Sequence, residues 1–365
     1  MLCMLYNTDI QDNTPTPFEV QRQLQKLIPS SWQLRLEKGE SERGPDALFS
    51  LAAPDGRRAT LVLEIKRRLD PVAVPRVAER MWSWTGDLRA TGAILSYLVV
   101  APYLSDRTRE RLRSSNLNYL DLTGNSFLQI DQPGIYIQTQ GASRDPNKAA
   151  RPARSLRGAK AAQVVRALVD FRPPLGIRQI AQIAGTDPGN VSRLVLLLER
   201  EALVRRSPAG GVEEVLWDEL LRAWARDYSL TESNRVYMYL DPRGLDNFLS
   251  RLRGLPPEVG YAVTGSLAAS RWAPAAPARM GMAFVRDAPG IAGALGLVST
   301  EAGANVLLIE PKGDFVFERT VVKEGITYVA PSQAVADLLP GLGRNPTEAE
   351  ELLEWMRKNE SVWRA

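Results

Sequence analysis

The sequence predicts an α/β multidomain protein with a helical segment at its centre. Its 365 residues exceed what one hydrophobic core usually organises, so two or three domains are expected. Strand-like apolar runs alternate with amphipathic helical runs over residues 1–140, and the alternation resumes near residue 237. The composition, with 44% apolar and 24% charged residues, is typical of a globular protein.

The first domain is predicted to cover residues 1–140. Its expected elements are a helix at 16–28, strands at 32–37, 47–53 and 59–66, a helix near 73–90 and a strand at 93–102. Residues 141–157 have no periodicity and are rich in Pro, Arg, Ala and Ser, which predicts a linker.

Three charged residues, Asp46, Glu64 and Lys66, match the PD-(D/E)xK pattern, and this domain resembles restriction-endonuclease-like folds. Apolar residues alternate on both sides of a turn at 54–57, which predicts two antiparallel strands. If the apolar residues of both strands lie on one face of the sheet, the two residue numbers of every antiparallel pair add up to the same even number, for example about 112. Asp46 would then lie across from Lys66, with Glu64 on the same face.

This charged cluster has three interpretations. In an active nuclease, Asp46 and Glu64 would be catalytic ligands of a divalent metal such as Mg²⁺, with Lys66 near the attacking water. Alternatively, the endonuclease-like fold serves only as a scaffold, or the charges mark an ordinary strand end. Glu19 is a candidate further metal ligand. Outside the nuclease interpretation, the sequence predicts no cofactor.

Residues 158–230 predict a winged helix-turn-helix. A first helix is followed by a short second helix, a turn at Gly185 and a third helix that begins at Asp187 and Pro188, residue types preferred at helix starts. The apolar residues predicted to face inward are Val164, Val165, Leu168 and Val169 in the first helix, and Ile180, Ala181, Ala184, Val191, Leu194, Leu197 and Leu198 in the other two.

The exposed side of the third helix is predicted to enter the major groove of double-stranded DNA, and a glycine-tipped wing to lie along phosphates. Residues 151–206 hold eleven Lys or Arg and four Asp or Glu, a local charge of +7. This surplus favours DNA over protein docking, the other role of winged helices. The predicted DNA-binding residues are Arg178, Asn190, Ser192, Arg193, Arg205 and Arg206.

The third domain, residues 235–365, is predicted to be α/β. A strand-like run ends at Gly265-Ser266 and opens a helix, which resembles the start of nucleotidyltransferase-like folds. Those enzymes need two carboxylates at i and i+2 on the next strand, but here Val285 stands two residues before Asp287. The resemblance implies an inactive fold in which Gly265 and Ser266 contact a ligand or protein partner. Alternatively, Gly265 only allows a tight turn.

Composition excludes several kinds of site. The chain has no histidine and one cysteine, Cys3, which excludes an internal disulfide, a Cys/His zinc site and a Ser-His-Asp triad. There is no signal-peptide pattern and no apolar run near the roughly 18 residues of a membrane span. We therefore expect a cytoplasmic protein without membrane contact. Two-fold operators favour a homodimer.

The segment NLNYLDLTGNSFLQI, residues 116–130, resembles the transcriptional regulators grouped with AbiEi-type antitoxins of type IV toxin–antitoxin systems. The resemblance implies a DNA-binding regulator, or an antitoxin whose toxin partner is a nucleotidyltransferase-like protein encoded beside it. Sequence-specific transcriptional control is the primary expectation. The residues that carry the resemblance are Asp121, Gly124, Asn125, Thr264, Gly265, Ser266, Gly303, Asn305, Pro331, Gln333 and Asp337.

Overall fold

The computed structural model describes residues 14–38, 44–84, 94–146, 155–256, 258–274 and 277–365. The chain divides into two compact units, Met1–Ala150 and Arg151–Ala365. The boundary falls inside the predicted linker. The segments predicted as second and third domains pack together in one unit.

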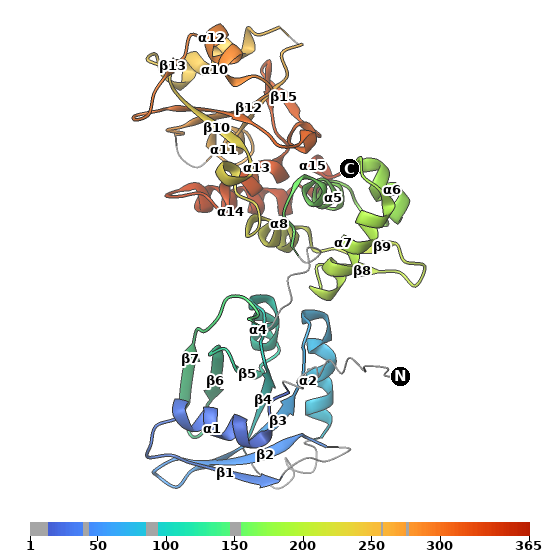
Figure 1. Cartoon of the computed structure of the whole chain (residues 1–365), viewed down its shortest axis with the longest axis vertical. Coiled ribbons are helices and arrows are strands. Elements are labelled where there is room, and N and C mark those ends of the chain that lie inside the picture. Colours follow the sequence, from blue (N-terminus) through green and yellow to red (C-terminus); the bar gives the residue numbers. More distant parts are fainter. Residues whose placement is uncertain (1–13, 39–43, 85–93, 147–154, 257, 275–276) are drawn as a thin grey trace, which may run out of the picture. The chain divides into compact units, whose positions relative to one another are not determined.

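The first unit is built on a seven-stranded sheet with the strands in chain order (Figure 1). The first three strands pair antiparallel, the next two continue in parallel, and the last two return antiparallel. The strands are β1 (Gln33–Lys38), β2 (Ala47–Ala52), β3 (Arg58–Ile65), β4 (Leu95–Ala101), β5 (Asn118–Asp121), β6 (Ser126–Ile130) and β7 (Ile135–Thr139).

Helices cover both faces of this sheet. Val20 and Leu24 of α1 pack with Phe49 and Leu61 in one apolar core, and a second core forms on the other face. The second core includes Met81 of α2 and apolar residues of α4. The helical elements are α1 (Pro17–Leu27), η1 (Pro71–Ala73), α2 (Val74–Ser83) and α4 (Asp106–Ser114).

The β2–β3 hairpin has the predicted apolar face but not the predicted pairing. Ala47 pairs with Leu63, so the numbers of paired residues sum to 110. The turn determines this register, because the Ala53 N–H donates to the Arg57 carbonyl at 2.9 Å and only three residues separate them. Gly56 supplies the positive φ, +84°, that so tight a turn requires. Asp46 therefore lies opposite Glu64, and its expected position across from Lys66 is wrong.

The predicted linker begins later than expected, because residues 141–143 pack on the first unit. The Gly141 N–H donates to the Asn125 side chain at 2.9 Å, and the Tyr103 hydroxyl donates to the Ser143 carbonyl at 2.9 Å. A Cβ at Gly141 would lie 2.1 Å from the Thr123 carbonyl oxygen, so only glycine fits there.

The second unit begins with a winged helix-turn-helix. Its elements are α5 (Ala159–Asp170), α6 (Ile177–Ile183), α7 (Pro188–Arg200) and a two-stranded wing of β8 (Val204–Arg206) and β9 (Val212–Val215). Leu175 bridges to Val212 and adds a third short segment to the wing sheet. As predicted, Gly185 turns the chain with a positive φ, +58°, and the Asp187 carboxylate caps α7 by accepting from the Asn190 N–H at 2.9 Å.

The core of this module differs from prediction in one helix. In α7 the buried stripe is Val191, Val195 and Leu198, while Leu194 and Leu197 are only partly buried. The spacing i, i+4, i+7 places Val195 inward, and the leucines at the edge of the stripe. The apolar residues predicted to face inward in α5 and α6 are buried.

The rest of the second unit is a mixed seven-stranded sheet with helices, ordered β13-β10-β14-β12-β11-β16-β15 (Figure 1). Its strands are β10 (Arg235–Leu240), β11 (Tyr261–Thr264), β12 (Gly281–Val285), β13 (Val298–Ser299), β14 (Val306–Glu310), β15 (Val321–Lys323) and β16 (Ile326–Tyr328). The helices are α8 (Trp217–Ala225), α9 (Leu230–Ser233), α10 (Leu245–Arg253), α11 (Gly265–Ala269), α12 (Ala288–Leu295), η2 (Asp314–Phe317), α13 (Pro331–Leu338), α14 (Asn345–Lys358) and α15 (Glu360–Trp363).

The carboxy-terminal part of α5, residues 164–170, is buried around its whole circumference, although its sequence predicts a single buried face. Arg166 and Asp170 form a salt bridge in which both side chains are 3% exposed. Asp170 also accepts from the Ser332 hydroxyl at 2.5 Å, and Arg166 donates to Gln333 at 3.0 Å. These partners belong to α13, so a polar network joins the helix-turn-helix to the α/β part of the unit.

A second buried acid, Asp337, extends this network. It accepts hydrogen bonds from the Tyr228 hydroxyl at 2.7 Å, the Thr264 hydroxyl at 2.5 Å and the Gln333 amide at 2.9 Å. Burial raises the pKa of Asp337 to about 6, although these three donors act in the opposite direction. Desolvation of the charged form therefore outweighs the hydrogen bonds that stabilise it.

We expect the Asp337→Asn substitution to remove a pH-dependent part of the stability. A carboxyl whose pKa is raised on folding stabilises the folded state below its unfolded pKa, near 3.8, and this contribution is lost as pH rises through about 6. The difference in unfolding free energy, wild type minus variant, should therefore fall between pH 4 and pH 6.5 in urea titrations. Asp246→Asn, at an exposed position, is the control. A difference that does not vary with pH would contradict this assignment.

Candidate nucleic-acid interface

The amino end of α7 presents polar side chains that are arranged before any ligand binds. The Arg193 side chain donates to the Gly189 carbonyl at 3.2 Å and to the Asn190 side-chain oxygen at 2.5 Å. Helical side chains point toward the amino end of their helix, which explains this direction. Arg193 is exposed, whereas Asn190 and Ser192 are half-buried. The surface therefore combines one guanidinium with amide and hydroxyl groups, the types that contact base edges and phosphates.

Both arginines of the wing are engaged within the module. Arg205 donates to Glu213 at 2.5 Å and to Glu214 at 3.0 Å. Arg206 pairs with Glu199 at 3.3 Å and also donates to a wing carbonyl. The charge of +7 belongs to residues 151–206, and the two glutamates of β9, Glu213 and Glu214, lie just beyond that range. The predicted phosphate contact by this strand would require Arg205 to leave two carboxylates.

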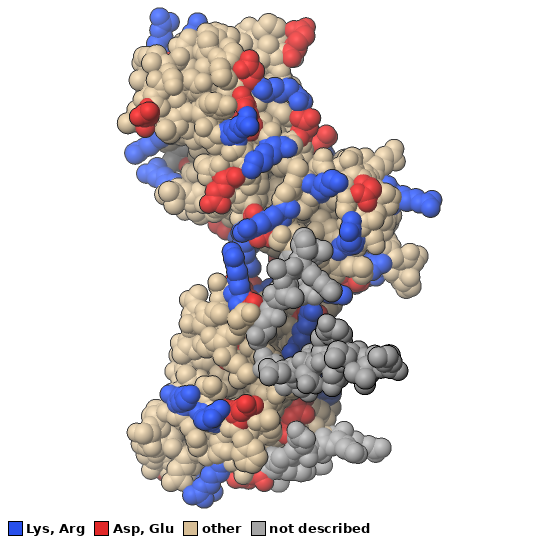
Figure 2. Space-filling view, viewed as in Figure 1, with Lys and Arg blue, Asp and Glu red and all other residues tan. Residues whose placement is uncertain are grey.

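The local charge surplus is smaller at the surface than the sequence suggests. Arg166 is buried in its ion pair, and Arg157 lies 3.6 Å from Asp227. Figure 2 shows acidic side chains among the Lys and Arg side chains of the second unit. The cations of the helix-turn-helix that are exposed and have no ion pair within the described part of the chain are Lys160, Arg172, Arg178, Arg193 and Arg200.

These helices, their turn and the first wing strand coincide with a known DNA-binding domain. Residues 159–208 match the IclR helix-turn-helix domain. The IclR-type domain supports a DNA-binding transcription regulator and spans α5, α6, α7 and β8. No curated protein and no solved structure matches the chain.

The charged cluster of the first unit is internally neutralised. Glu64 is 1% exposed and forms salt bridges with Lys66 and with Arg80 of α2. The Asp46 carboxylate accepts from the Ile65 N–H at 2.5 Å. Burial lowers the pKa of Lys66, and the nearby Asp46 charge opposes that effect. Arg80, which the sequence pattern does not single out, takes the place beside Glu64 where a metal would have to bind.

These residues do not fit a divalent metal site. Among the side chains that the structure describes, no group of three carboxylate, thiol or imidazole ligands is placed to hold a metal ion. Glu19, proposed above as a further ligand, instead closes a capping box with Thr16 at the start of α1. That helix packs on the apolar face of the β2–β3 hairpin, opposite to the face of Glu64.

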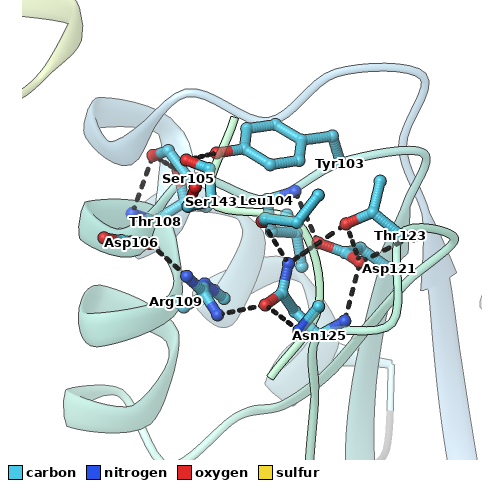
Figure 3. Close-up of polar contacts among 12 residues, drawn as sticks. Tyr103, Leu104, Ser105, Asp106, Thr108, Arg109, Asp121, Thr123, Asn125 and Ser143 are labelled. Carbon is cyan, nitrogen blue, oxygen red and sulfur yellow. Dashed lines mark hydrogen bonds and ion pairs between the residues drawn. The ribbon is translucent and has the colours of Figure 1, made fainter. Parts of the chain in front are cut away.

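The residues that carry the AbiEi resemblance in the first unit form a closed hydrogen-bond network (Figure 3). Asp121 accepts from the N–H groups of Thr123 at 2.9 Å, Asn125 at 3.0 Å and Leu104 at 3.1 Å. Asn125 donates to Asp121 at 2.8 Å and to the Ala142 carbonyl at 3.1 Å. The motif thus fixes the β5–β6 turn to two neighbouring segments. The polar groups of the motif form hydrogen bonds with one another and with neighbouring backbone groups, so the motif has a structural role.

Gly265 and Ser266 open α11, a helix of five residues. Gly265 has a φ of +66°, and a Cβ there would lie 3.0 Å from the Met282 sulfur. The positive φ and the nearby sulfur atom are enough to explain why this turn has a glycine. Asp287 caps α12 by accepting from the Gly290 N–H at 3.0 Å, and Val285 is buried. The predicted ligand or partner contact of Gly265 and Ser266 stays a prediction.

Within the described residues, no helix combines the length and apolar character needed to cross a lipid bilayer.

A plasmid-nicking assay with Mg²⁺ or Mn²⁺ tests the charged cluster. We expect no metal-dependent nicking by the wild type, because a metal at Glu64 would have to displace Lys66 and Arg80. Arg80→Met, which frees one side of Glu64, is the informative variant and should also be inactive. Nicking by the wild type that is lost in both Asp46→Ala and Lys66→Ala would instead establish the nuclease.

Proposed function

We propose that the protein is a sequence-specific transcription regulator that reads double-stranded DNA with the amino-terminal half of α7. The observation that carries the proposal is the IclR-type domain at residues 159–208, whose α7 begins with a polar group of the exposed Arg193 and the half-buried Asn190 and Ser192. A helix inserted into the major groove contacts base edges with residues of its first turns. Arg193 is the residue of this group suited to guanine or phosphate, and Asn190 is suited to adenine.

The cap of α7 supports this mode of binding. Asp187 holds the Asn190 backbone at the start of the helix, and Asn190 in turn accepts from Arg193 at 2.5 Å. The guanidinium therefore rests beside the helix amino terminus, and less side-chain freedom is lost when DNA is bound. Arg178, exposed on α6, is proposed as a phosphate contact that fixes the position of α7.

The remaining roles are proposed for the flanking parts of the chain. The first unit serves as a scaffold with an endonuclease-like arrangement, and the α/β part of the second unit is a non-catalytic, nucleotidyltransferase-like fold. Binding as a homodimer to a two-fold operator fits a helix-turn-helix reader. An antitoxin role, implied by the AbiEi resemblance, requires a nucleotidyltransferase-like toxin, and sequencing the reading frame beside this gene tests it.

We expect Arg193→Ala to weaken binding to the preferred duplex by about tenfold or more, because it removes a base or phosphate contact. The preferred duplex is first selected from a random library, and affinities are measured by mobility shift at several salt concentrations. Arg243→Ala, an exposed arginine in the loop before α10, should leave the affinity unchanged. Equal affinities of both variants, or an affinity that does not fall as salt rises, would refute DNA reading by α7.

The double substitution Glu213→Gln, Glu214→Gln should strengthen binding to any duplex. It releases Arg205 from both of its acidic partners and removes two negative charges from the wing. If the wing lies along phosphates, the slope of log affinity against log salt should steepen by about one. Glu301→Gln with Glu351→Gln makes the same change in net charge at exposed positions outside the wing. An equal gain in both double variants would mean that only net charge matters.

A further inference from the structure

A cavity of about 460 Å³ lies where the helix-turn-helix meets the α/β part of the second unit. Its walls come from the amino end of α5, from α8 and the segment up to Asn234, and from Lys312, Phe315 and Pro340 of the α/β part. The volume lies within the range of small-molecule sites. Because α5 is the first helix of the IclR-type domain, a ligand here would touch both the DNA-binding module and its partner domain.

One wall of the cavity is aromatic. The Trp224 ring lies 5.0 Å from the Tyr228 ring and 6.1 Å from the Phe315 ring, measured between centroids. All three side chains line the cavity and are almost fully buried. Such a wall favours a ligand with a flat apolar ring, because aromatic pairs gain from edge and offset contacts in addition to buried area.

Other groups that line the cavity favour an anion. Gly158 is the N-cap of α5 and offers no side chain to its first turn, so the free N–H groups there carry partial positive charge. Lys312 lines the cavity and has no ion pair within the described part of the chain. Asp227 is engaged by the Leu156 N–H at 2.8 Å and by Arg157, and Glu232 is exposed.

We propose that this cavity binds a small molecule that carries a flat ring and an anionic group, a carboxylate or a phosphate, and that its occupancy changes DNA affinity. The effect on DNA affinity rests on the proposed function. Tyr228, in the cavity wall, donates to Asp337, which accepts from Gln333. Gln333 accepts from Arg166 at 3.0 Å in the middle of α5. Three hydrogen bonds thus connect the ligand wall to the helix that supports α6 and α7.

Calorimetric titration of the full chain without DNA tests the site. Benzoate and phenyl phosphate should each bind saturably at one site, the better of the two identifying the anionic group, and uncharged benzyl alcohol should bind at least about tenfold more weakly. Lys312→Gln should weaken the anions about tenfold, whereas Lys358→Gln, outside the cavity, should not. Ala159→Trp, at a half-buried lining position, should abolish binding while the variant keeps its melting transition.

Two results would overturn the site: no saturable heat with either anion, or saturable binding that both Lys312→Gln and Ala159→Trp leave unchanged. Regulation is tested separately by mobility shift with the better anion present. We expect at least a threefold change in duplex affinity for the wild type, on the order of 0.6 kcal/mol, and none for Ala159→Trp. Anion binding with unchanged duplex affinity would overturn regulation but keep the site. Anion binding by a chain that binds no duplex would overturn only the proposed function.

Discussion

The buried salt bridge between Arg166 and Asp170 is the constraint on which the second unit depends. A guanidinium has five N–H donors, and here they all have acceptors: Asp170, Gln333, and the carbonyls of Phe315 and Glu318. Removing one partner of such a pair leaves an uncompensated buried charge, at a cost of about 3–5 kcal/mol. A helix-turn-helix separated from residues 315–337 would expose this pair and lose most of its acceptors. The DNA-binding module and the α/β part are therefore one folding unit.

This dependence has a consequence for function. A reader helix on a separate domain is free to reorient, but α7 packs on α5, and α5 is held by hydrogen bonds to α13 and to the segment after η2. Any change in the α/β part that moves those acceptors must either move α5 or break a buried polar contact. Chains of packed side chains and hydrogen bonds of this kind can carry energetic coupling between distant sites. The fold thus connects the α/β part mechanically to the helices of the DNA-binding domain.

Helix starts and turns could be predicted from the sequence, whereas contacts between residues far apart in the chain could not. Asp187-Pro188 and Gly185 define the start of α7 and the turn before it through their own backbone preferences, and the structure has both. The alternation in β2 and β3 identified their shared face, but the register depended on how many residues the turn at Gly56 contains. Arg80 beside Glu64 and the α13 side chains around α5 come from distant parts of the chain, so no spacing rule reveals them.

Partners from distant parts of the chain also distinguish the two predicted polar sites, the charged cluster at Glu64 and the arginines of the helix-turn-helix. The buried Glu64 carboxylate already has two internal partners of opposite sign, Lys66 and Arg80, and a metal would first have to break these ion pairs. The wing arginine Arg205 is paired too, but with exposed glutamates, which water and salt can replace at little cost. Arg193 contacts only neutral oxygens and remains exposed. Among these groups, the amino end of α7 is therefore where a polyanion meets the lowest desolvation cost, and DNA contact should begin there.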